Sequence, residues 1–102
     1  MEQDEKIKNG KSLYARGQSL FTEGRYEEAF DCYMKAAELK NIDAITMVGY
    51  CYIVGAGVAT NCNEGVKYSL LAATEGNSNA QNNVGWCYQN GFGVPANEKE
   101  AL

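Results

Sequence analysis

A repeat with a period of 36 residues is the feature of this sequence that most restricts its fold. Residues 43–66 align without gaps to residues 79–102, and 10 of the 24 positions are identical. The identical pairs are Ala44/Ala80, Val48/Val84, Gly49/Gly85, Cys51/Cys87, Tyr52/Tyr88, Gly55/Gly91, Gly57/Gly93, Val58/Val94, Asn61/Asn97 and Glu64/Glu100. A repeat of this length is typical of chains that stack small units of secondary structure, so we expect such an array here.

The spacing inside each unit predicts two helices joined by a turn. Small and apolar residues recur at i, i+4, i+7, i+8 and i+11 and therefore share one helical face. They are Ala44, Val48, Cys51, Tyr52 and Gly55. We expect the glycines at 55 and 57 to end the first helix with a left-handed cap, and Asn61 to cap the second. The second helix is expected to end at Gly76 and Asn77.

The first forty residues carry a shorter version of the same unit. Gly17 precedes Gly49 by 32 residues, whereas Ala29 precedes Gly65 by the full 36. The difference predicts that the turn around Gly24 is four residues shorter than the later turn. We therefore expect one domain, residues 1–102, with repeats at about 6–41, 42–77 and 78–102, the third of them truncated.

Two repeat families share these motifs. Residues 17–36 resemble a tetratricopeptide repeat through Gly17, Gly24, Tyr26, Ala29, Tyr33 and Ala36, although Arg16 stands where leucine is usual. The later units resemble Sel1-like repeats, whose LG-x-x-Y-x-x-G-x-GV pattern appears as Val48-Gly49, Tyr52, Gly55 and Gly57-Val58, and again as Val84-Gly85, Tyr88, Gly91 and Gly93-Val94. Asparagines at 61 and 97 replace the usual aspartate. The resemblance implies an all-α fold, a right-handed α–α superhelix or solenoid of about two and a half helix–turn–helix repeats.

Composition argues against several classes of function. The 9 basic residues against 13 acidic ones give a net charge of −4, which is a poor match for nucleic acid. Histidine is absent from the sequence, and the four cysteines at 32, 51, 62 and 87 form no C-x-x-C pair. Neither a zinc site nor a nucleophile–base pair is therefore indicated. We expect a protein that is not an enzyme, with no catalytic residues, no cofactor and no metal.

The cysteines and the N-terminus bear on the surroundings of the chain. Cys51 and Cys87 fall on the predicted buried face, whereas Cys62 falls in a polar turn and is expected to be the most exposed thiol. The N-terminus is polar and lacks the pattern of a signal peptide. All apolar stretches are far shorter than the roughly 20 residues of a membrane span. These features predict a cytoplasmic, or else nuclear, protein without membrane insertion.

The tetratricopeptide resemblance also implies where a partner would bind. In that family the first helix of each pair lines the concave face of the solenoid. Transferred position by position, the predicted surface consists of Lys11, Tyr14, Gln18, Phe21, Asp43, Thr46, Tyr50, Ile53, Asn79, Asn82, Trp86 and Gln89. Aromatic rings and amides suit an extended peptide or a partner helix, so the predicted function is a protein-interaction adaptor or scaffold. Tyr50 and Trp86 either contact the partner or pack between neighbouring units.

An alternative function follows from the end of the sequence. Residues 98–102 fall inside what should be the second helix of the third unit. Part of the apolar face around Val84, Cys87 and Tyr88 would then lack cover. We expect a fragment of a longer array, an end that dimerises, or an end that a partner completes. In the alternative function the protein is a structural unit that self-assembles through this end, as in a homodimer, and no ligand occupies the groove.

Overall fold

The computed structural model describes residues 2–91, and five helices lie in this range. They are α1 (Glu2–Thr22), α2 (Tyr26–Glu38), α3 (Ile42–Val54), α4 (Cys62–Thr74) and α5 (Ser78–Asn90). The described residues contain no strand, which confirms the all-α prediction. The predicted helix over residues 98–102 and the motif residues Gly93, Val94, Asn97 and Glu100 lie outside the described residues.

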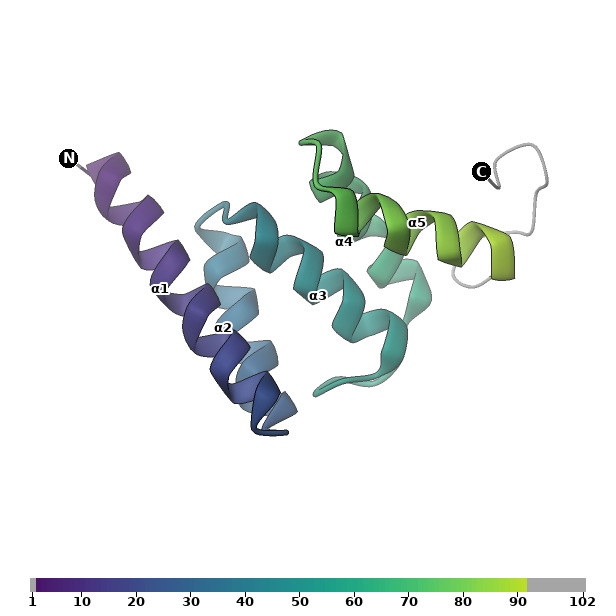
Figure 1. Cartoon of the computed structure of the whole chain (residues 1–102), viewed down its shortest axis with the longest axis horizontal. Helices are drawn as coiled ribbons and strands as arrows, with labels where there is room; N and C mark the ends of the chain where they lie inside the picture. Colours follow the sequence, from purple (N-terminus) through teal and green to yellow (C-terminus); the bar gives the residue numbers. More distant parts are fainter. Residues whose placement is uncertain (1, 92–102) are drawn as a thin grey trace.

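The helices are arranged as successive antiparallel pairs. Figure 1 shows α1, α3 and α5 side by side in one layer, with α2 and α4 behind them. α1 packs along α2, and α3 packs along α4, while α2 and α4 each also contact the first helix of the following unit. This is the helical-repeat solenoid predicted from the sequence, and the turn lengths agree as well. Three residues separate α1 from α2 and seven separate α3 from α4, a difference of four.

Asparagine side chains cap the N-termini of three helices. The Oδ1 atoms of Asn41, Asn61 and Asn77 accept hydrogen bonds from the backbone N–H groups three residues later, at 2.8, 3.2 and 3.0 Å. Each asparagine satisfies one of the amides that a helix leaves without an internal partner. The predicted role of Asn61 is confirmed, and the caps at 41 and 77 repeat at the 36-residue period.

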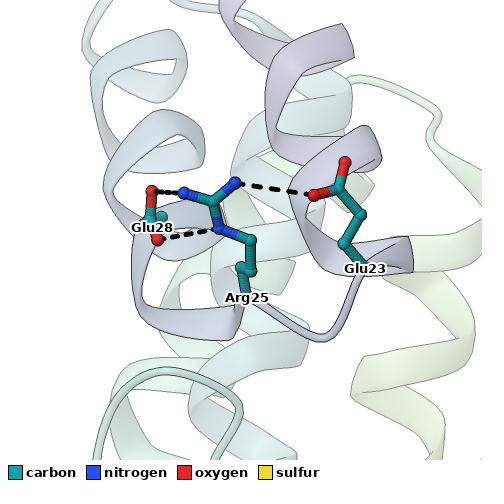
Figure 2. A network of polar contacts seen from close by, with 3 residues as sticks. All are labelled: Glu23, Arg25 and Glu28. Carbon is teal, nitrogen blue, oxygen red and sulfur yellow. Dashed lines mark hydrogen bonds and ion pairs between the residues drawn. The ribbon is translucent and has the colours of Figure 1, made fainter.

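The start of α2 is different. Arg25 occupies the position equivalent to Asn61 and makes no side-chain cap. Its guanidinium instead donates to both carboxylate oxygens of Glu28, at 2.9 and 2.6 Å, and lies 3.5 Å from Glu23 (Figure 2). All three side chains are more than half exposed, so solvent screens this network and it contributes little to stability.

Glycines in left-handed conformation form the turn after α3. Gly55 has φ of 77° and its N–H bonds to the carbonyl of Cys51, as predicted for the helix cap. Gly57 also has φ of 77°, and a side chain there would collide with the backbone carbonyl of Tyr26. The turn of the second unit therefore packs directly on the first residue of α2 and joins the two units.

The core lies between the two layers. One cluster contains Leu20, Ala29, Tyr33, Val48 and Cys51, and a second contains Ile53, Val66 and Cys87. The prediction that Ala44, Val48, Cys51 and Cys87 are buried is confirmed. The prediction that Cys62 lies in a turn is wrong, because it is the first residue of α4 and is half-buried, as is Cys32.

Candidate partner-binding site

Two adjoining pockets lie on the layer formed by α1, α3 and α5, and together they are called the groove here. The polar pocket, of about 260 Å³, is lined by Tyr14, Asp43, Thr46, Met47, Tyr50, Asn79, Asn82 and Asn83. The apolar pocket, of about 280 Å³, is lined by Tyr50, Ile53, Val54, Asn82, Asn83 and Trp86. Tyr50, Asn82 and Asn83 line both pockets, so the two form a continuous depression.

The repeat explains why these residues face the same way. Asp43, Thr46, Met47 and Tyr50 occupy positions i, i+3, i+4 and i+7 of α3 and so share one face of the helix. The 36-residue offset carries them onto α5, where the equivalent residues are Asn79, Asn82, Asn83 and Trp86. Equivalent faces of successive units meet in one groove, to which α1 adds Tyr14.

Most of the residues predicted for the concave face are brought together. The groove includes Tyr14, Asp43, Thr46, Tyr50, Ile53, Asn79, Asn82 and Trp86. Four predicted residues line neither pocket. Lys11 and Gln89 are exposed elsewhere, and Gln18 accepts a hydrogen bond from the buried hydroxyl of Tyr33. Phe21 packs edge-on against Tyr26, with 4.9 Å between the ring centroids.

Three groove residues were missed by the sequence prediction, namely Met47, Val54 and Asn83. The prediction took one residue for each turn of the first helix. Residues at i+3 and i+4 lie on the same helical face. Met47, Val54 and Asn83 each lie four residues after a predicted groove residue, so the helical spacing could have identified all three.

The two large aromatic residues of the groove are partly exposed. Tyr50 retains 39% and Trp86 retains 48% of its accessible surface, whereas Thr46 and Ile53 retain only 4% and 8% and form the floor. The Tyr50 ring also packs 6.4 Å from that of Phe21, measured between centroids. Each of the two rings thus has one part packed on the protein and another part exposed at the groove surface.

Asp43 is the one charged residue that lines the groove within the described chain. Its Oδ1 accepts a hydrogen bond from Asn77 Nδ2 at 3.0 Å, which links the first turn of α3 to the cap of α5. Burial, and secondarily the charge of Asp43, raises the pKa of the Tyr14 phenol. Tyr14 therefore remains protonated at neutral pH and can both donate and accept a hydrogen bond.

Asparagine amides form the wall contributed by α5. Within residues 2–91, the side chains of Asn79, Asn82 and Asn83 make no hydrogen bond to the protein. Each amide offers donors and an acceptor, which is the combination that a peptide backbone requires. The wall can therefore bind main-chain groups without selecting a particular side chain.

Other chemistry is not indicated by the described residues. No group of three or more carboxylates and thiols in this part of the chain is arranged to hold a metal ion. Burial raises the pKa of the Cys51 and Cys87 thiols to about 11, so neither is a nucleophile at neutral pH. Between residues 2 and 91, none of the helices has the length and apolar character needed to cross a bilayer.

Paired helices, glycine-capped turns and a groove built from equivalent positions define a helical-repeat protein. A family model described as Sel1 repeat matches residues 10–41, 42–77 and 78–102. The chain therefore belongs to the Sel1 repeat family, whose members generally act as protein–protein interaction modules and are typically non-enzymatic scaffolds. Residues 10–41, which resemble a tetratricopeptide repeat in sequence, also match this family.

A solved structure supports the same assignment. The chain is similar to the crystal structure of a Sel1 repeat protein from Oxalobacter formigenes, with 34% sequence identity and a TM-score of 0.79. The match covers 87% of this chain and 36% of the other. The chain thus spans about a third of the length of that relative.

Proposed function

We propose that this chain is an adaptor module that holds an extended peptide segment, or a helix, of a partner protein in the groove. One observation carries the proposal. Tyr50 and Trp86 occupy equivalent positions of successive units, are partly exposed, and line the same pocket. Partly exposed aromatic residues backed by a packed floor are the side chains that dominate the energy of protein interfaces.

The openness of the pockets supports a peptide rather than a small molecule. Sites for small molecules typically bury most of the ligand. The two adjoining pockets, of about 260 and 280 Å³, are instead open to solvent. Each is suited to one side chain, and the asparagine amides between them are suited to the backbone that joins two side chains.

The proposal is tested by display selection. A library of random linear peptides is selected on the immobilised protein, and the enriched peptides are measured against Tyr50→Ala and Trp86→Ala. Each substitution should weaken binding at least about tenfold, the usual effect of truncating an interface aromatic. Circular dichroism should show that both variants remain folded.

Leu71→Ala is the control, because Leu71 is a large apolar residue of α4 that is 56% exposed and lines neither pocket. Its replacement should leave the affinity unchanged. Peptides whose binding tolerates both groove substitutions, or a selection that enriches nothing, would overturn the proposed function. Light scattering over a range of concentrations addresses the alternative function. If the mass rises with concentration and Trp86→Ala does not change it, self-assembly is favoured over a groove ligand.

A further inference from the structure

The two pockets of the groove differ in chemistry although they adjoin. The polar pocket contains the carboxylate of Asp43 together with amide side chains from α5. The apolar pocket has aliphatic and aromatic walls that include Trp86. Because Asn82 and Asn83 line both, a single extended segment can place one side chain in each pocket while its backbone crosses the amides.

The charge of the polar pocket favours a basic side chain. Ion pairs of the described residues involve Arg25 and Lys67, so no lysine or arginine in residues 2–91 neutralises Asp43. One oxygen of this carboxylate accepts from Asn77, and the group lies in the wall of the pocket. Asp43 is exposed to solvent, and a carboxylate at such a position can bind a lysine or arginine through a charge-assisted hydrogen bond. The net charge of −4 also attracts a basic segment.

The helix dipoles favour an anion in the polar pocket and so oppose the effect of Asp43, but they are weaker. The polar pocket lies beside the first turns of α3 and α5, and a helix N-terminus carries about half a positive charge. The amides that produce this charge point along the helix axes, and one at each end already bonds to Asn41 or Asn77. The carboxylate of Asp43 lies in the pocket wall, so it would directly repel an anion bound there.

We infer that the groove selects partner segments in which a lysine or arginine lies close to a large apolar residue. The basic side chain occupies the polar pocket beside Asp43, and the apolar side chain packs against Trp86. The backbone between them contacts the amides of Asn82 and Asn83. This inference rests on the proposed function, since it defines the chemistry of the segment that the groove binds.

The same display selection tests the inference through the sequences that it enriches. Peptides selected on the unmodified protein should be enriched in lysine or arginine near leucine, isoleucine, phenylalanine, methionine or tryptophan. Selection on Asp43→Lys should lose the basic residues and retain the apolar ones. Groove-dependent peptides without basic enrichment, or enrichment of acidic residues, would overturn the inference and leave the proposed function standing.

A binding measurement adds a second test. Trp86 is the single tryptophan of the chain, so its fluorescence reports a titration with the best enriched peptide. Asp43→Asn keeps an oxygen that can accept from Asn77 and should weaken binding about two- to fivefold, the effect of an exposed charge pair. The weakening should diminish as salt is added. Equal affinities of the variant and the unmodified protein would contradict the inference.

The matched control is Asp31→Asn, which removes the same charge from an exposed residue of α2 that lines neither pocket. It should change the affinity by less than about twofold, because solvent screens a distant exposed charge. An equal loss in the two variants would mean that only the net charge matters, and it would overturn the role assigned to Asp43. Failure of the whole selection would instead overturn the proposed function.

Discussion

Gly49 is the position at which replacement by alanine tests the packing of the second helix pair most directly. α3 and α4 approach so closely there that an added Cβ would lie 2.5 Å from the Oγ of Ser69. It would also lie 3.0 Å from the carbonyl oxygen of Gly65 and 3.2 Å from the backbone nitrogen of Ser69. The hydroxyl could rotate away, but the two backbone atoms belong to α4 and move only if that helix shifts.

The size of the effect follows from two opposing terms. Overpacking a well-packed interior costs about 1–3 kcal/mol, and contacts with backbone atoms put Gly49→Ala in the upper part of that range. Replacing glycine by alanine inside a helix stabilises the folded state by about 1 kcal/mol through helix propensity. We therefore expect a net loss of about 1–2 kcal/mol. In a domain of this size that loss lowers the melting temperature by about 5–15 °C.

Gly10→Ala is the matched control for this measurement. Gly10 is also a buried helical glycine, but a Cβ there would meet its nearest neighbours at 3.4 and 3.6 Å, which is ordinary contact. The propensity gain should then dominate and raise the melting temperature by a few degrees. Both variants are measured by thermal and urea unfolding followed by circular dichroism. If Gly49→Ala were as stable as the unmodified protein, the close approach of α3 and α4 would be refuted.

Three further predictions concern stability. Asn61→Ala should destabilise the protein by about 1 kcal/mol in urea unfolding, because the α4 cap is lost. Arg25→Ala should leave the unfolding midpoint unchanged, because its ion pairs are exposed. Ser69→Ala should leave stability unchanged or raise it by up to about 1 kcal/mol in the same assay, since the buried Ser69 Oγ has no hydrogen-bond partner among the described residues. The thiols of Cys51 and Cys87 titrate at about 11 in the folded protein against an ordinary value of 9.0, so the unfolded chain binds fewer protons between these pH values. Stability should therefore fall as the pH rises through this window, by roughly 1 kcal/mol for each thiol between pH 8 and pH 10, and the fall should shrink when Cys51 and Cys87 are both replaced by alanine.

The repeat period accounts for how much of the fold could be predicted from the sequence. The alignment of residues 43–66 with residues 79–102 predicts the caps at Gly55 and Asn61, the turn lengths and part of the buried face from local rules. Asn61 and Gly55 illustrate this, since each adopts the role that its residue type favours at a helix end. Such features depend on neighbours in the chain, and these are visible in the sequence.

Contacts between helices were harder to predict. Gln18 and Phe21 lie on the expected helix. However, Gln18 accepts a hydrogen bond from the hydroxyl of Tyr33, and Phe21 packs against the ring of Tyr26, and neither lines the groove. The division of the groove into a polar and an apolar pocket depends on how α1, α3 and α5 are placed relative to one another. That placement depends on packing between units, such as the turn at Gly57 against the backbone of Tyr26, which the motif residues alone do not reveal.

This separation between the packed face and the groove face would favour the binding of a flexible peptide, as proposed above. Residues on one side of α3, among them Val48 and Cys51, are fully buried, whereas Tyr50 projects from the other side. A binding residue carried by a helix that is packed in this way loses little conformational freedom when a partner arrives, so more of the contact energy appears as affinity. The same arrangement means that loosening α3 at Gly49 should weaken peptide binding without removing any groove residue. A loss of binding can therefore be assigned to Tyr50 or Trp86 only when the unfolding transition of the variant is unchanged.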